Sequence, residues 1–507
     1  NTLDASFLVE APITDNISFA AGARRSYIDF FFDKIVPDEA FDVVAAPVYW
    51  DYQAFLTWRP TNKDRVHLSW YGSSDRLELV FGNPIDGDPA LGGGFDQDTS
   101  FHRGQVSWER KLSKDIDQEL LFSFGPTNVL FALGDTLSFD GDFFEMNGRA
   151  EWTARVTPDV RLVGGMDIQV IPFSIGYTGP PPTQAEGNPN SMAPLSSRTT
   201  STVASSDVAY RPAAYAEMSL RPIDPLEFIV GMRADWYREI QEWSVDPRAA
   251  AILSLSDDTR LKGGVGIFSQ PPEFQESSEI LGNPNLDPNH ALHTSAGVEH
   301  DIIPGLSVGA EGYFKYLWDR VVGTQGGVAP RFNNDGVGRI YGMELSGRFS
   351  PESQRWFGYF SYTLSRSERR DHPGEIWRVF DFDQSHILTI AGVYRLGRGW
   401  EAGGTFRLVT GNPETPIVGG EYYANTDIYL PRYGATNSGR VGAFHRLDIR
   451  VEKKWDFQAW KLALYLDIQN VYNRQNPEGT FHNYDFSESS TLSGLPFLPS
   501  LGIRGEL

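Results

Sequence analysis

The stretch WKLALYLDIQNVYN, residues 460–473, decides the fold of this chain. Read in steps of two, one of its faces is apolar: Trp460, Leu462, Leu464, Leu466 and Ile468. The other face carries Lys461, Ala463, Tyr465, Asp467 and Gln469. Strict alternation over about ten residues is typical of a β-strand with one apolar and one wet side.

The segment before it repeats the pattern. Leu447, Ile449 and Val451 alternate with Arg446, Asp448, Arg450 and Glu452. A face with this many charges cannot line a dry core, because each unpaired charge would be desolvated at high cost. A strand between a water-filled lumen and lipid would have this pattern. We therefore predict an all-β fold, a large transmembrane antiparallel up-and-down β-barrel, with Leu447, Ile449, Val451, Leu462, Leu464 and Leu466 facing lipid.

Bulk composition supports a barrel and excludes other classes. The mean hydropathy is −0.33, and no apolar run approaches the roughly 18 residues of a transmembrane helix. The aromatic share of 13% fits belts at two membrane–water interfaces. A net charge of −22 argues against binding to nucleic acid. The absence of cysteine removes disulfides and thiol chemistry and is compatible with an oxidising periplasmic route.

Turn residues divide the chain into strands joined alternately by short and long connections. Short polar turns are predicted at 14–16, 61–64, 114–117, 157–159, 223–225, 257–259, 304–305, 351–354, 396–399 and 458–459. Longer Gly-, Pro- and Asp-rich loops are predicted at 33–47, 82–99, 179–207, 270–290, 324–338, 371–385, 411–442 and 474–494. Tight turns at one end and long loops at the other are typical of outer-membrane barrels, with turns periplasmic and loops extracellular.

This division gives about 21 strands of roughly 10–18 residues in a single domain, residues 1–507. Bacterial single-chain barrels have even strand numbers. We therefore expect a complete unit of about 22 strands, with one strand upstream or on a separate chain. No signal peptide opens the sequence, which suggests a mature or truncated product.

Several local motifs, taken in order, resemble the barrel of TonB-dependent outer-membrane receptors. The clearest is FSQPPEFQESSEILGNPNLDPNHALHTSAGVE at 268–299. It is followed by NDGVGRIYGMELSGR at 334–348 and DQSH at 383–386. The C-terminal sequences LDIQNVYNRQNPEG and LPSLGIRGEL resemble the penultimate and last strands of that family.

The resemblance implies an energy-coupled importer in the bacterial outer membrane. A plug domain filling the barrel would contact the TonB complex, and the C-terminus would be periplasmic. Two departures stand out: no plug sequence is present in the 507 residues, and Leu507 ends a chain where this family usually ends in an aromatic residue. The plug is expected upstream or on a separate chain. Partners are then the plug, TonB and outer-membrane lipid or lipopolysaccharide.

Two loops carry candidate binding residues. In loop 411–442 exposed aromatic and arginine side chains can form a ligand platform: Tyr422, Tyr423, Tyr429, Arg432, Tyr433 and Arg440. Lipopolysaccharide contact is the competing interpretation. Loop 82–99 is acidic, and hard cations prefer several carboxylates, so a Ca²⁺ site is a hypothesis for Asp86, Asp88, Asp96 and Asp98. The alternative there is an ordinary solvated loop.

We find no sequence motif for an enzyme and expect no cofactor apart from the Ca²⁺ hypothesis. His290, His293 and His300 do not form H-E-x-x-H, and alternation places His290 and His293 on opposite strand faces. Asp383 and His386 are more simply lumen-lining than catalytic. Two other functions stay open beside the importer: an open porin-like channel and an adhesion- or secretion-linked barrel.

Overall fold

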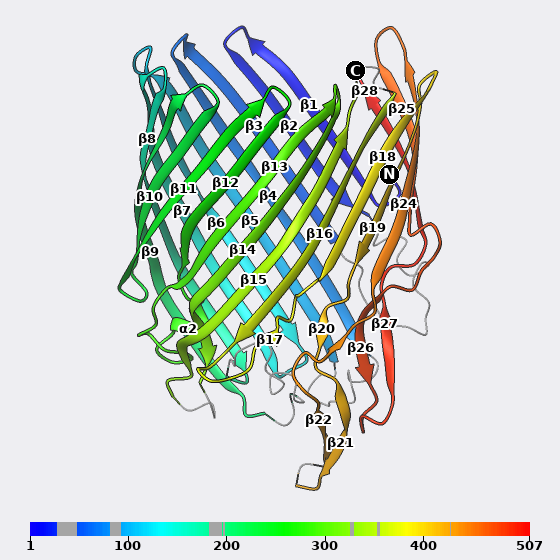
Figure 1. Ribbon diagram of the computed structural model, residues 1–507. Coiled ribbons are helices and arrows are strands. Elements are labelled where there is room, and N and C mark those ends of the chain that lie inside the picture. The colour runs from blue at the N-terminus through cyan, green and yellow to red at the C-terminus, as the bar shows by residue number, and fades with distance from the viewer. Residues whose placement is uncertain are drawn as a thin grey trace.

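The structure is a computed structural model that describes residues 1–27, 48–81, 93–181, 195, 198–324, 329–351, 355–425 and 427–507. One antiparallel sheet of 22 strands curls into a barrel (Figure 1). Its strands follow chain order: β1 (Asp4–Thr14), β2 (Ile17–Ser26), β3 (Val48–Thr61), β4 (Asp64–Phe81), β5 (Gly93–Lys111), β6 (Ile116–Leu133), β7 (Leu137–Thr157), β8 (Val160–Gly179), β9 (Ser201–Ile223), β10 (Leu226–Tyr237), β11 (Glu242–Ser256), β12 (Thr259–Gln270), β13 (Asn289–Ile303), β14 (Leu306–Gly323), β15 (Phe332–Phe349), β16 (Trp356–Arg370), β17 (Arg378–Val379), β18 (His386–Gly397), β19 (Trp400–Val409), β24 (Phe444–Asp456), β25 (Lys461–Gln469) and β28 (Leu498–Glu506).

Because β17 is a two-residue segment, 21 long strands build the barrel wall. This confirms the predicted all-β up-and-down architecture and strand number. The short turns lie at the upper end in Figure 1 and the long connections at the lower end. Strands reach 23 residues in β9, longer than predicted.

The predicted loops are shorter than expected because several wall strands continue into them. β5 begins at Gly93, so Asp96 and Asp98 lie in a ladder with β4, where Asp98 stands opposite Arg76. β9 likewise begins at Ser201, inside predicted loop 179–207. Polar residues can occupy both faces of a strand beyond the lipid because water covers both, so composition alone did not locate these strand ends.

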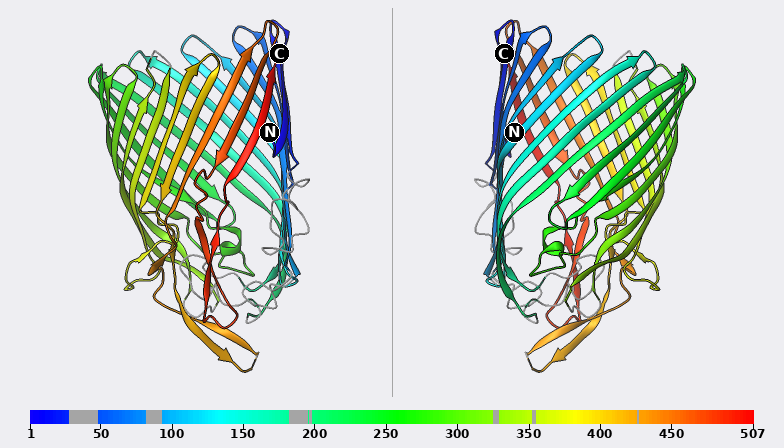
Figure 2. Two further views of the ribbon diagram at one scale, coloured as in Figure 1. Left: turned by 90° about the vertical axis from the view of Figure 1, so that its right-hand side faces the viewer. Right: turned by 90° about the vertical axis from the view of Figure 1, so that its left-hand side faces the viewer.

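Three further pairs of strands fold inside the long connections. They are β20 (Pro413–Glu414) with β23 (Gly439–Arg440), β21 (Ile417–Tyr423) with β22 (Ile428–Tyr433), and β26 (Pro477–His482) with β27 (Ser489–Ser493). A four-residue helix, α2 (Phe274–Ser277), lies in the connection after β12. Figure 2 shows α2 and the hairpins at the end of the barrel with long connections. Among the described residues, no helix is long and apolar enough to cross a membrane.

The register of β24 and β25 separates the two predicted faces. Arg450 stands opposite Asp467 and donates to it at 3.0 Å, while the apolar pair Val451 and Leu466 points the other way. Leu464 and Leu466 keep 40% and 39% of their surface exposed, as expected of side chains that face lipid. The inward face is therefore charged and the outward face apolar.

Aromatic side chains mark the short-turn end of the outward face. Trp356 packs on Tyr394 with ring centroids 4.3 Å apart. Lys453 lies 5.6 Å from the Trp400 ring and 5.4 Å from the Trp455 ring. A belt of Trp and Tyr with a snorkelling Lys is typical of a membrane–water interface.

The two ends of the sheet, β1 and β28, run in the same direction, toward the short turns. Within the described residues no strand ladder joins them. The hydroxyl of Thr2 donates to that of Ser500 at 3.1 Å, and this contact brings the edges together. Each edge strand is thus paired on one side.

Candidate functional site

The hairpin β21–β22 projects beyond the wall at the end with long connections (Figure 1). Its tip is ordered by its own side chains: the Tyr422 hydroxyl donates to Asp427 at 2.6 Å, and the Tyr422 and Tyr429 rings lie 5.3 Å apart. Tyr422 and Tyr423 are 52% and 47% exposed. The hairpin therefore presents aromatic surface to solvent.

A second hairpin, β26–β27, completes this surface. Tyr484, in its turn, packs edge-on against Tyr429 with centroids 5.7 Å apart and is 64% exposed. A Cβ on Gly420 would lie 2.2 Å from the carbonyl oxygen of Asp485, so only glycine permits this approach of the two hairpins. We call Tyr422, Tyr429 and Tyr484 the aromatic cluster. Our sequence reasoning missed Tyr484, although aromatic residues in loop 474–494 were visible.

Arg440 and Tyr433 lie at the base of the projecting hairpin. Arg440 donates to the carbonyl oxygens of Asp383 at 2.7 Å and Gly411 at 2.9 Å, and it forms a short ion pair with the Asp383 carboxylate. Asp383 is 1% exposed and also accepts from the backbone N–H of Ser367 at 2.6 Å. Arg440 thus fastens loops 371–385 and 411–442 to the wall.

Tyr433 and Arg432 differ in their surroundings. The Tyr433 hydroxyl is buried and has no hydrogen-bond partner among the described residues, and burial raises its pKa to about 12. Arg432 is exposed, and among the described residues it donates to the Val418 carbonyl oxygen alone, at 3.5 Å. The six-residue ligand platform stays a prediction, with Tyr422, Tyr423, Tyr429 and Arg432 on the hairpin and the other two at its base.

The Ca²⁺ hypothesis also stays a prediction. Asp86 and Asp88 lie outside the described residues. Asp96 and Asp98 lie in β5, where one carboxylate oxygen of Asp96 is buried without a partner. In the described part of the chain, no three His, Asp or Glu side chains come together as metal ligands.

The histidines and the Asp383–His386 pair have separate partners. His386 hydrogen-bonds the Tyr362 hydroxyl at 2.8 Å, whereas Asp383 is held by Arg440. His290 stacks on Trp318 at 5.2 Å, and His300 hydrogen-bonds Thr259 at 2.9 Å. These histidine contacts join neighbouring strands of the barrel wall.

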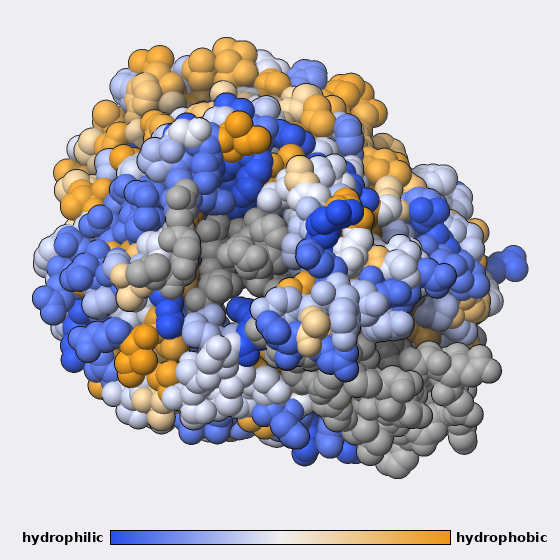
Figure 3. Space-filling model, turned by 90° about the horizontal axis from the view of Figure 1, so that it is seen from below, coloured by the Kyte–Doolittle hydropathy of each residue, from blue (hydrophilic) through white to orange (hydrophobic). Residues whose placement is uncertain are grey.

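Polar networks line the lumen. Asp167 accepts from Arg149 at 2.7 Å and from Arg233 at 2.6 Å, and Arg233 also pairs with Asp235 at 2.8 Å. Figure 3, which views the end with long connections, shows hydrophilic residues over most of this end and hydrophobic residues toward the outer margin. The molecule therefore has a wet interior, an apolar belt and a polar end that carries the aromatic cluster.

The model of the family "TonB dependent receptor-like, beta-barrel" matches residues 68–471. The chain belongs to this family. Family members are receptors and transporters of the outer membrane, and the chain is a TonB-dependent outer-membrane receptor barrel. Among curated proteins, none matches the sequence.

Solved structures of TonB-dependent receptors share the fold. The ferric-catecholate import receptor Fiu of E. coli K12 has a TM-score of 0.71 at 12% identity, over 99% of this chain and 81% of that one. The ferric yersiniabactin uptake receptor FyuA of Yersinia pestis has a TM-score of 0.70 at 12% identity, over 99% and 77%. FpvA of P. aeruginosa, solved with pyoverdines, has a TM-score of 0.72 at 11% identity, over 99% and 69%.

Proposed function

We propose that this TonB-dependent receptor barrel imports an iron–siderophore complex, captured at its extracellular end by the aromatic cluster. The fold neighbours named above are receptors for ferric siderophores, which suggests the solute class. The observation that carries the proposal is the cluster itself. Three tyrosines from two hairpins pack together at the end with long connections, with Tyr422 and Tyr484 exposed and Tyr429 half-buried between them. Clustered aromatic side chains at an exposed site bind ligands with little loss of side-chain entropy.

We further propose that a plug and one additional strand complete the unit, from an upstream segment or a separate chain. β1 and β28 run in the same direction, so one antiparallel strand can pair with both free edges. In lipid each unpaired backbone group on those edges costs several kcal/mol. A lumen enclosed by 21 wall strands would stand open as a wide pore without a plug.

The orientation follows from the connections. Short turns face the periplasm in barrels of this type, so Leu507 at the short-turn end would be periplasmic and the aromatic cluster extracellular. TonB would then bind the plug from the periplasmic side and pull on it. The protein would bind and translocate its solute without bond chemistry.

Uptake of radiolabelled ferric siderophores by cells that depend on this receptor tests the proposal. We expect uptake of at least one siderophore, abolished by a protonophore. Tyr429→Ala and Tyr484→Ala should each weaken solute binding, by about 1 kcal/mol for the aromatic ring removed. Phe382→Ala is the matched control, because Phe382 is an exposed aromatic residue in another long connection and belongs neither to the cluster nor to the predicted platform.

Two results would contradict the proposal. Uptake that continues unchanged in de-energised cells would indicate passive diffusion, and a steady large conductance of the complete protein in a planar bilayer would indicate a porin. Equal losses for Phe382→Ala and Tyr429→Ala would show that the aromatic cluster does not capture the solute.

A further inference from the structure

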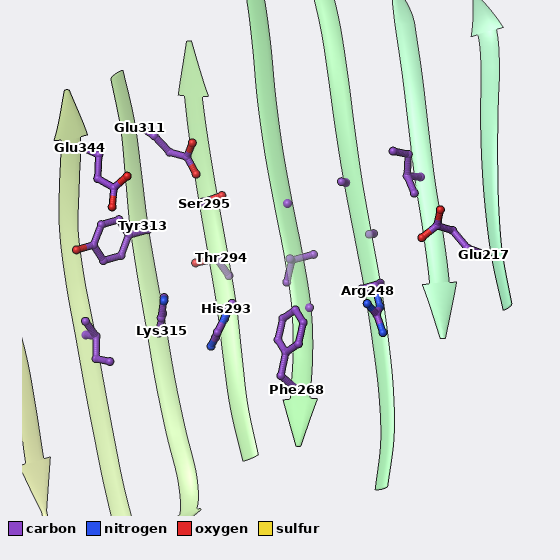
Figure 4. A pocket seen from close by; sticks show the side chains of 17 residues that line it. Glu217, Arg248, Phe268, His293, Thr294, Ser295, Glu311, Tyr313, Lys315 and Glu344 are labelled. Atoms are coloured by element: carbon purple, nitrogen blue, oxygen red, sulfur yellow. The ribbon is translucent and has the colours of Figure 1, made fainter. Parts of the chain in front are cut away.

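A row of basic side chains crosses the lumen wall in its extracellular half. Arg248 on β11 stands opposite Gly266 on β12, Gly266 opposite His293 on β13, and His293 opposite Lys315 on β14. All three basic residues share the inward face, and Figure 4 shows them at one level on three strands. The strand register therefore brings together cations that are far apart in the sequence: Arg248 and Lys315 are separated by 67 positions.

Neither of the two permanent cations in this row is neutralised. Within the described residues, no carboxylate lies within 4.0 Å of Arg248 or Lys315. Both cations lie near rings instead: Arg248 is 5.8 Å from the Phe268 centroid, and Lys315 is 5.8 Å from that of Tyr313. Both cations therefore keep a positive charge that an anionic group could approach from the lumen.

Neighbouring lumen residues show what ordinary pairing looks like. Lys262, on the same strand as Gly266, binds Glu299 at 2.7 Å and Glu311 at 3.4 Å. Arg233, on the strand before Arg248, binds Asp235 at 2.8 Å and Asp167 at 2.6 Å. Glu217 and Glu344 also line this hollow, yet neither forms an ion pair with Arg248 or Lys315. The nearby carboxylates are thus either paired with other cations or too distant to pair with Arg248 and Lys315.

The floor beneath the row is hollowed. Ala250, Gly264 and Gly266 put little or no side chain into the lumen there, and the resulting recess has a volume of about 580 Å³. A Cβ on Gly266 would come within 3.1 Å of the Phe268 ring, so glycine makes room for that ring. Phe268 is 40% exposed and lies 4.7 Å from the His293 ring. A recess of this size suits a small organic group rather than one water or ion.

The recess lies on the periplasmic side of α2. Phe274 of α2 packs edge-on against Phe173 of β8, with centroids 5.2 Å apart, so the connection after β12 reaches back across the wall at that level. A solute entering from the aromatic cluster would pass α2 before meeting the basic row. The recess is therefore a second site, deeper than the cluster.

We propose that this basic recess, formed by Arg248, Phe268, His293 and Lys315, binds the anionic, ring-bearing part of the transported solute during passage. Arg248 and Lys315 would donate to a carboxylate or a similar oxyanion, and Phe268 would cover the attached ring. Its role in transit rests on the proposed import function, whereas anion binding by the recess does not. An acidic side chain of a plug is the competing occupant.

Benzoate is a suitable probe because it joins a carboxylate to one flat ring. Calorimetric titration of the complete protein in detergent should detect benzoate binding that weakens as salt is raised. Arg248→Gln and Lys315→Gln should each weaken binding about tenfold, the effect of losing one charged hydrogen bond. Benzamide, the neutral analogue, should also bind about tenfold less tightly. Phe268→Ala should weaken benzoate binding but leave inorganic phosphate binding unchanged.

Arg161→Gln is the matched control, since Arg161 is an inward-facing wall cation on β8 near the short turns. It should leave benzoate affinity unchanged. Absence of binding, equal weakening by Arg161→Gln, or affinity indifferent to both Arg248→Gln and Lys315→Gln would overturn the proposal. Binding that appears only once a plug has been removed would assign the recess to a plug carboxylate and overturn it as well. Heat-modified gel mobility shows that each variant has folded.

Different results would contradict the proposed import function and the proposed role of the basic recess. Benzoate binding that depends on Arg248 and Lys315, in a receptor that imports no siderophore, would retain the recess and remove the proposed solute. Siderophore import that Arg248→Gln and Lys315→Gln do not slow would retain the importer and remove the transit site.

Discussion

An arginine placed at Ile449 should measure how the wall sits in the bilayer. Ile449 is on the outward face, opposite Gly404 on β19 and Ile468 on β25, two rows deeper than Lys453. Lys453 lies between Trp400 and Trp455 and marks the interface. An arginine near the bilayer midplane costs about 2–4 kcal/mol, and one near the interface about 0–1 kcal/mol. We therefore expect about 2–4 kcal/mol for Ile449→Arg.

The same strands offer two controls. Leu464 stands directly opposite Lys453, so Leu464→Arg should cost about 0–1 kcal/mol. Thr405 shares the depth of Ile449 but faces the lumen opposite Asp448, so Thr405→Arg should cost less than about 1 kcal/mol. Urea titration of folding into phospholipid vesicles, followed by tryptophan fluorescence, gives the three free energies. Equal costs at Ile449 and Thr405 would refute the assignment of the two faces.

Three further predictions concern the long connections. Arg440→Met removes the nearer of the two arginines beside buried Asp383 and leaves Arg366 at 3.9 Å, so we expect local destabilisation of about 3 kcal/mol. Proteolysis within 411–442 should become faster, whereas exposed Arg432→Met should change neither. Burial raises the pKa of Tyr433 to about 12 against an ordinary 10.0, so the hairpin should lose stability as pH rises from 10 toward 12. Tyr433→Phe should abolish that loss and remove the latest step of phenolate absorbance. Burial, and next the charge of Glu273, raise the pKa of Glu276, so α2 should dock more tightly as pH falls through that raised value. Hydrogen exchange of 273–283 should show this in the native chain and not in Glu276→Gln.

The barrel wall could be predicted from the sequence because the alternation of its strands depends on neighbouring residues alone. Alternation at Leu462, Leu464 and Leu466 depends only on the two-residue period of a strand, and the turns of the described wall fall where Pro, Gly, Asp and Asn predicted them. The strand ends were less predictable. At Asp96 and Asp98 polar composition indicated a loop, although both residues lie in the β4–β5 ladder, Asp98 opposite Arg76 and Asp96 opposite Glu78.

The sites depend on contacts that sequence order hides. Arg440 meets Asp383 across 57 positions, and Tyr484 meets Tyr429 across two hairpins. Arg248, His293 and Lys315 meet only because the registers of four strands place them in one row. A one-residue slip of β11, β13 or β14 would turn its cation away from the lumen. Local patterning therefore predicts which residues face the lumen, but not which of them are neighbours.

The close approach of Gly420 to Asp485 has a mechanical consequence. The hairpin that contains Asp485 lies in the connection between β25 and β28. In the described wall β28 has a strand ladder on its β25 side alone, and the hydrogen bond between Thr2 and Ser500 is a contact on its other side. A displacement of the aromatic cluster by a bound solute would therefore act, through that connection, on one of the two edge strands of the sheet. The aromatic cluster and the seam between β1 and β28 are thus linked through one short stretch of chain, residues 494–497.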